Sequence, residues 1–235
     1  MVASEAMGQR REDDSHEARE AMVGELGRAY AAAVLAGDEV AAEVVIRDAL
    51  DADLSVAEVD EEIIAPALWL VGELWERGEI TVADEHLATE ICVRVLALER
   101  EARRVARGRP AQLIMLATPA GELHVIALRM VANMLHDAGY EVMMVGADVP
   151  PHALASMAGR YRPDVICLSG TMPRSGDQMM ISIHEVERLW AGAGFIVGGR
   201  GVTSRLEWRP GIAVCNRIAD VVEAVDGLVK RAGLN

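Results

Sequence analysis

Glu122 and His124 are the residues of this chain whose types and spacing best suit metal binding. An imidazole can present one ring nitrogen to a metal, while a nearby carboxylate holds the other ring nitrogen as a hydrogen-bond acceptor. Taken alone, the pair also fits a solvated turn at the start of a helix. The surrounding sequence decides between these two interpretations.

A second group of such residues lies in the segment WERGEITVADEH, which runs from residue 75 to residue 86. Trp75 is followed, after nine residues, by the adjacent Glu85 and His86. Val82 lies between Trp75 and Glu85. Glu and His are also common on solvated helix surfaces. Their role therefore depends on the elements that carry them.

The composition favours a folded protein and argues against several classes of partner. Of the 235 residues, 51% are hydrophobic but only 3% are aromatic, so the core must consist of aliphatic residues and Met. The net charge of −14 argues against direct binding to nucleic acid or anionic membranes. Apolar runs are too short to span a bilayer, and the N-terminal residues lack an apolar signal segment. Cys92, Cys167 and Cys215 are widely spaced, which is typical of reduced thiols in a cytoplasmic protein.

Residues 14–107 show helical periodicity and are predicted to form a four-helix bundle. The predicted helices begin at residues that cap helices well: Ser15, Asp38, Ser55 and Thr81. Pro66 is expected to kink the third helix. Residues 1–13 are predicted to be disordered, and the bundle is expected to end in a basic linker that leads to a second domain at residue 108.

Residues 108–235 alternate short apolar runs with helical stretches. The predicted strands are 112–117, 141–145, 165–169, 195–198 and 212–215. The predicted helices are 124–137, 152–160, 178–191 and 218–230, with a further helix allowed at 202–208. Five β–α repeats imply a five-stranded parallel sheet with helices on both faces. Such a sheet binds ligands in the loops after its strands, and these loops carry Glu122, His124, Ser169, Gly198 and Gly199.

This second half resembles the cobalamin-binding domains that take cobalamin base-off, with a protein His replacing the cofactor's own base. The family's signature is Asp-x-His-x-x-Gly, Ser-x-Leu and Gly-Gly, to which residues 122–127, 169–171 and 198–199 are similar. The resemblance implies a flavodoxin-like Rossmann domain, with His124 as the lower axial cobalt ligand and the helical bundle as a cap over the corrin. The departures, which include Glu122 in place of Asp, leave the ligand itself in place.

The segment from Trp75 to His86 resembles the cap of the CarH-type light sensors, which use adenosylcobalamin. The resemblance implies that Trp75 and Val82 pack against the adenosyl group, while Glu85 and His86 bind its polar parts or the corrin rim. In the best-known sensors a His follows the Trp and binds cobalt after illumination. Here that residue is Glu76, so we expect water or His86 as the upper ligand after photolysis.

The resemblance also implies the function, which is that of a light sensor and not of an enzyme. Photolysis of the cobalt–carbon bond is expected to change the conformation of the protein. This change would alter its contacts with further copies of the chain or with an output protein. CarH-type regulators carry an N-terminal DNA-binding domain, for which about 14 polar residues leave no room. We therefore expect a stand-alone cytoplasmic homo-oligomer, without DNA or membrane binding, similar to the photocobilins, which bind biliverdin beside cobalamin. The alternative is a corrinoid protein that carries methyl groups for a methyltransferase system.

Overall fold

The computed structural model describes residues 2–102, 112–202 and 208–231. The chain divides into two compact units, Met1–Leu98 and Glu99–Asn235. This boundary lies inside helix α5 (Val82–Ala102), N-terminal to the boundary expected at residues 107 and 108. Helix-favouring Glu, Arg and Ala residues carry α5 past Leu96, a buried residue of the bundle core.

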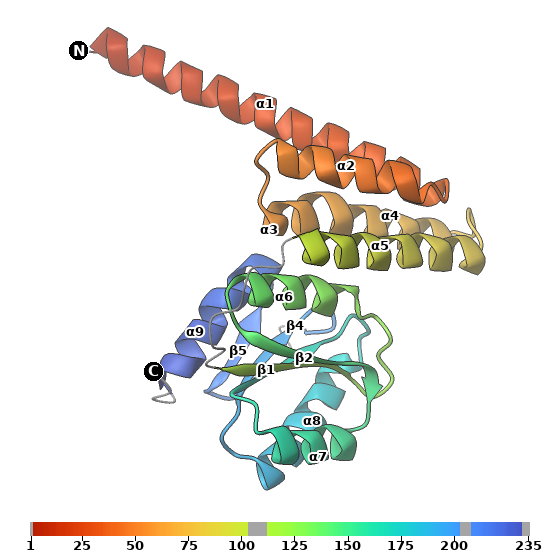
Figure 1. The fold of residues 1–235 in the computed structure, drawn as a ribbon, viewed down its shortest axis with the longest axis vertical. Helices are drawn as coiled ribbons and strands as arrows, with labels where there is room; N and C mark the ends of the chain where they lie inside the picture. Colours follow the sequence, from red (N-terminus) through yellow and green to blue (C-terminus); the bar gives the residue numbers. More distant parts are fainter. Residues whose placement is uncertain (1, 103–111, 203–207, 232–235) are drawn as a thin grey trace. The chain divides into compact units, whose positions relative to one another are not determined.

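The first unit is the predicted helical bundle (Figure 1). Its elements are α1 (Val2–Leu35), α2 (Glu39–Asp51), α3 (Val56–Glu58), a π-helical segment (Val59–Ile64), α4 (Ala65–Glu76) and α5. Three predicted caps are confirmed. Asp38 Oδ1 accepts a hydrogen bond from Ala41 N at 3.0 Å, and Ser55 and Thr81 each form a reciprocal pair with the acidic residue three positions later.

Two features of this unit differ from the sequence-based prediction. Helix α1 begins at Val2, whereas residues 1–13 were expected to be disordered. The segment has no Pro and is rich in Ala, Glu and Arg, so nothing in its composition stops the helix. The third predicted helix is divided by the π-helical segment. Pro66 has no N–H to donate, and its ring crowds the preceding turn. In this segment Ala65 N donates to Asp60 O, five residues earlier, and not to the residue four positions earlier as in an α-helix.

The second unit contains the five-stranded parallel sheet that the sequence predicts, and its strands lie in the order β2-β1-β3-β4-β5. Its strands are β1 (Leu113–Pro119), β2 (Glu141–Val149), β3 (Val165–Ser169), β4 (Gly194–Gly198) and β5 (Ile212–Cys215). Its helices are α6 (Ile126–Asp137), α7 (Pro151–Tyr161), α8 (Ser175–Leu189) and α9 (Val221–Arg231), the last preceded by a 3-10 turn at Ile218–Asp220. Residues 203–207, most of the further helix allowed by the sequence, lie outside the described part of the chain.

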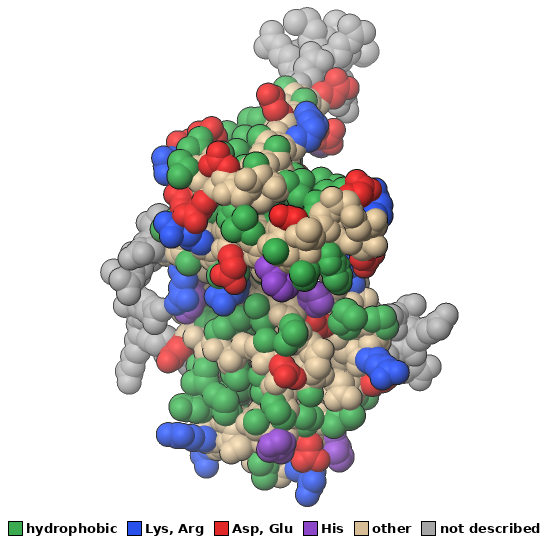
Figure 2. Space-filling view, turned by 90° about the vertical axis from the view of Figure 1, so that its right-hand side faces the viewer, with side chains coloured by type: hydrophobic (Ala, Val, Ile, Leu, Met, Phe, Trp, Pro, Cys, Tyr) green, Lys and Arg blue, Asp and Glu red, His purple; other side chains and the backbone are tan. Residues whose placement is uncertain are grey.

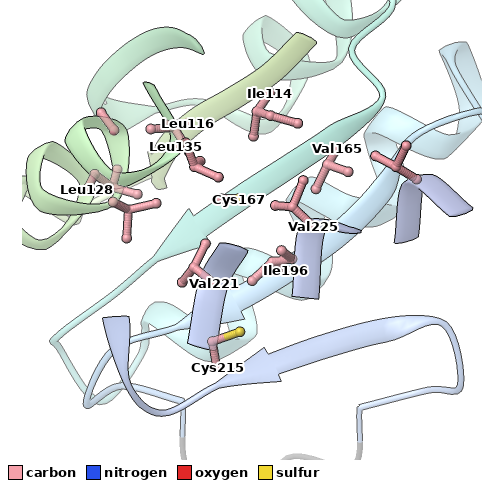
Figure 3. Packing of buried hydrophobic residues seen from close by; sticks show 13 residues of the cluster. Ile114, Leu116, Leu128, Leu135, Val165, Cys167, Ile196, Cys215, Val221 and Val225 are labelled. Atoms are coloured by element: carbon pink, nitrogen blue, oxygen red, sulfur yellow. The ribbon is translucent and has the colours of Figure 1, made fainter. Parts of the chain in front are cut away.

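Each face of the sheet packs against one pair of helices. Figure 3 shows Ile114, Leu116, Cys167 and Ile196 from three neighbouring strands pointing toward α6 and α9. The other face packs against α7 and α8 through residues such as Met115 and Ile166. The three cysteines are free and buried, as expected of core thiols.

The strand order places the loops after β1 and β3 at the same edge of the sheet. Strand β1 lies between β2 and β3, so this edge is the point where the order of strands reverses, which is where open α/β sheets bind ligands. No helix in the described ranges combines the length and hydropathy needed to cross a bilayer.

Candidate functional site

Glu122 lies in the loop between β1 and α6, and its side chain is completely buried. Its Oε2 accepts hydrogen bonds from the backbone N of Thr171 at 2.6 Å and of Met172 at 2.9 Å, and from Ser175 Oγ at 2.6 Å. All three donors follow β3. The carboxylate therefore ties together the two loops that flank the point of strand reversal.

The other oxygen of Glu122 orients His124. Oε1 accepts a hydrogen bond from His124 N at 3.0 Å and lies 2.5 Å from His124 Nδ1. The imidazole itself is 58% exposed. Because Nδ1 is held by the carboxylate, Nε2 is the ring nitrogen left to bind a ligand from the open side, which is how proteins prepare a His to bind metal.

The protonation state of Glu122 follows from these contacts. Burial by itself raises the pKa of this carboxyl group, but the hydrogen bonds from Met172 N, Ser175 Oγ and His124 favour the charged form and together lower the pKa to about 2. Glu122 is therefore ionised at neutral pH. An ionised carboxylate can only accept hydrogen bonds, so His124 Nδ1 carries the proton that they share.

Ser169, Gly198 and Gly199 lie at the same edge, where the loops after β3 and β4 approach closely. Ser169 is buried and pairs with Gly198 in the sheet. A Cβ at Gly198 would lie 2.9 Å from Cys215 O, and one at Gly199, whose φ is +94°, would lie 2.4 Å from Gly170 O. The two glycines are thus required by backbone packing, which shapes this edge of the sheet.

An open pocket of about 580 Å³ lies beside the loops that carry Glu122 and its donors. It is lined by Ala120, Gly121, Met172, Pro173, Arg174, Ser175 and Gln178. A Cβ at Gly121 would meet no atom within 4 Å, so the loop after β1 leaves open space there. The pocket therefore offers space for a ligand beside the loops after β1 and β3.

The bundle carries the second group of candidate residues, around the turn between α4 and α5. Trp75 is 47% exposed near the end of α4, and Val82 is 51% exposed at the start of α5. Glu85 Oε2 lies 2.5 Å from His86 Nδ1, and Glu85 Oε1 accepts a hydrogen bond from Thr89 Oγ1 at 3.1 Å. Figure 2 shows hydrophobic side chains at the surface among charged ones. On α5 the exposed Val82 precedes Glu85 and His86 by three and four residues, so one turn of this helix carries an apolar side chain and the carboxylate–imidazole pair.

The structure thus brings together Glu122, His124, Ser169, Gly198 and Gly199 in one unit, and Trp75, Val82, Glu85 and His86 in the other. In the described part of the chain, no three His, Cys, Asp or Glu side chains converge as a metal site. Sequence reasoning missed the partners of Glu122 that follow β3, because all three are distant in the sequence and two of them are backbone N–H groups, which leave no signal in residue type.

Both units match known protein families. A family model described as a B12 binding domain matches residues 112–225, and a second model with the same description matches residues 26–99. The HTH-type transcriptional repressor CarH of Myxococcus xanthus is 32% identical over 178 residues, which are 74% of this chain and 56% of that protein. The chain therefore spans little more than half the length of that relative.

A second kind of relative has a different activity in its name. Trimethylamine corrinoid protein 1 of Methanosarcina mazei is 30% identical over 175 residues, which are 71% of this chain and 78% of that protein. Among solved structures, the Methanosarcina barkeri monomethylamine corrinoid protein superposes with a TM-score of 0.69 at 20% identity, covering 87% of this chain and 99% of that one. At this identity the match supports the fold alone.

Proposed function

We propose that this chain, which belongs to the family of B12-binding proteins, is a light sensor that uses adenosylcobalamin. Family membership rests on the two matching B12 binding domains and on the corrinoid relative of which the chain covers 78%. Cobalamin binding follows from the family. The adenosyl form, the response to light and the residue roles are our proposal.

His124 is proposed as the lower axial ligand of cobalt, with cobalamin bound base-off. The donor set suits this role, because Glu122 holds Nδ1 and leaves Nε2 to the exposed side. The open pocket beside Gly121 offers space for part of a corrinoid. Ser169, Gly198 and Gly199 would bind the cofactor through the shape of the sheet edge that they form.

The observation that carries the proposal of an adenosyl ligand is the surface around the α4–α5 turn. Trp75 at the end of α4 and Val82 at the start of α5 are half-exposed apolar side chains, and Glu85 and His86 form an oriented polar pair one turn after Val82. A nucleoside has an apolar base face together with ribose hydroxyls, so it would use both kinds of contact. A methyl group would leave the apolar surface of Trp75 largely uncovered.

When bound, adenosylcobalamin would supply a cobalt–carbon bond that light cleaves. Loss of the adenosyl group would expose Trp75 and Val82 again and free Glu85 from its ligand contacts. Contacts that exist only in the dark state shift the balance between conformations of the bundle. The proposed output is a changed contact with further copies of the chain or with a partner protein.

A corrinoid methyl carrier is the alternative, and it is favoured by the similarity to trimethylamine corrinoid protein 1 over 78% of that protein's length. In that case His124 would keep its role as lower ligand. The exposed Trp75 would then face the methyltransferase partner or remain in solvent.

The test is to load the protein with adenosylcobalamin in the dark and record absorption and size-exclusion profiles before and after green light. The proposal expects a change in both, and an absorption spectrum unaffected by light would refute it. Trp75→Ala should weaken binding of adenosylcobalamin but not of methylcobalamin. Trp69→Ala is the matched control, because Trp69 is a similarly exposed Trp on another face of α4. Biliverdin added to the loaded protein should give red absorption that persists after desalting if a bilin is a second chromophore.

A further inference from the structure

Asp148, near the end of β2, has a left-handed backbone with a φ of 51°. This conformation is costly for a residue with a side chain, and such residues concentrate where the surrounding structure needs them. The pairing of β1 with β2 shifts register twice before this point, between Leu116 and Ala117 and between Ala117 and Pro119. These irregularities turn the end of β2, which gives Asp148 its position beside the loop after β1.

Asp148 forms hydrogen bonds with the backbone on both sides of the peptide bond between Gly121 and Glu122. Its Oδ1 accepts a hydrogen bond from Gly121 N at 2.7 Å. Its backbone N donates to Glu122 O at 3.0 Å and to Thr118 Oγ1 at 3.0 Å. The buried Thr118 hydroxyl in turn donates to Glu122 O at 2.5 Å. The backbone of Gly121 and Glu122 is therefore fixed from the β2 side, while the Glu122 carboxylate is fixed from the β3 side.

We propose that Asp148 is a positioning residue for His124. Its hydrogen bonds go to Gly121, Glu122 and Thr118 and not to the imidazole. It sets the backbone from which Glu122 and His124 project, so that the carboxylate meets its donors after β3 and also faces Nδ1 of the imidazole. The left-handed backbone is needed because Asp148 offers its N–H and its side-chain oxygen to the same short loop. This inference rests on the proposed binding of cobalt by His124.

Three substitutions separate the hydrogen bond from the backbone conformation. Asp148→Asn keeps an acceptor and tolerates a positive φ, Asp148→Gly tolerates the φ without the acceptor, and Asp148→Ala lacks both. Arg162→Gly is the matched control, because Arg162 also has a φ of 51° in the same unit but lies at the end of α7, where its N–H donates to Ala158 O and its guanidinium lies over the Trp190 ring.

The readout is the electron paramagnetic resonance spectrum of ¹⁵N-labelled protein loaded with reduced, Co(II) cobalamin. A nitrogen from the protein splits the cobalt lines into doublets, whereas the cofactor's own unlabelled nitrogen gives triplets. We expect doublets in the wild type, in Asp148→Asn and in Arg162→Gly. We expect a smaller doublet fraction, and a cobalamin dissociation constant raised by about fivefold, in Asp148→Gly and Asp148→Ala.

The outcomes distinguish this inference from the proposed function. A wild type without doublets would remove His124 as the cobalt ligand, and the inference with it. Doublets in the wild type that persist at full strength in Asp148→Gly would overturn the positioning role alone. Circular dichroism checks folding: an Asp148→Gly chain that unfolds, beside a folded Asp148→Asn, would show a role in stability and likewise overturn the inference.

Discussion

Replacing Glu122 by Gln tests the buried carboxylate at the centre of the site. The substitution keeps the size of the side chain but removes its charge, and the amide NH2 must then face some of the donors that a carboxylate accepts. Burial alone would raise the pKa of Glu122. Its hydrogen bonds outweigh burial and lower the pKa from 4.5 to about 2. A shift of this size corresponds to about 3 kcal/mol of folding free energy.

The pH dependence gives the sign of the effect. Because the pKa of Glu122 is lower in the folded than in the unfolded chain, its stabilising contribution is complete above the unfolded value of 4.5 and is lost as the pH falls toward about 2. The protein without cofactor should therefore lose about 3 kcal/mol at pH 7 on Glu122→Gln, and the difference between the two proteins should shrink steadily from pH 5 to pH 2.

Urea unfolding of the wild type and the variant, followed by circular dichroism at several pH values, measures this difference. Glu58→Gln is the control, since the pKa of Glu58 is also lowered to about 2, first through its hydrogen bond from Arg19, but at the surface of the bundle. Solvent screening should keep its cost below about 1 kcal/mol. A Glu122→Gln variant as stable as the wild type at pH 7, or a difference that does not depend on pH, would refute the reasoning.

Three further predictions concern Gly199, His124 and Cys92. Gly199→Ala should destabilise the fold by about 1–3 kcal/mol in urea unfolding, because Gly199 has a positive φ and lies close to Gly170 O. The control is Gly227→Ala in α9, which has open space around it and should be neutral or stabilising. His124→Ala should abolish the protein nitrogen signal on Co(II) cobalamin. It should also destabilise the cofactor-free chain by about 1–2 kcal/mol in urea unfolding, because the buried Glu122 carboxylate loses its hydrogen bond from Nδ1. Burial raises the pKa of Cys92 to about 11, so iodoacetamide should label this thiol in the folded protein far more slowly than in urea, and rapid labelling of the native chain would contradict its burial.

Local sequence patterns predicted most of the fold. The five strands are short apolar runs bounded by Gly, Pro or charged residues. This pattern involves only residues that are close in the sequence, so it can be recognised without the structure. The caps of α2, α3 and α5 could also be predicted, because each cap involves residues within three positions. The N-terminal extension of α1 was not predicted, since its many charged residues favour a helix and a disordered segment alike.

The candidate residues show the same division between local and distant contacts. The Glu122–His124 and Glu85–His86 pairs are each within two positions in the sequence, so their mutual hydrogen bonds could be expected from spacing alone. The sequence by itself therefore determined the parallel sheet, the helical bundle and the imidazoles that can bind a metal. Only the tertiary structure decided that Glu122 is buried and ionised, because its donors after β3 and the contacts of Asp148 from β2 come from segments far along the chain. Backbone N–H groups and left-handed residues acquire such roles only when folding brings distant segments together.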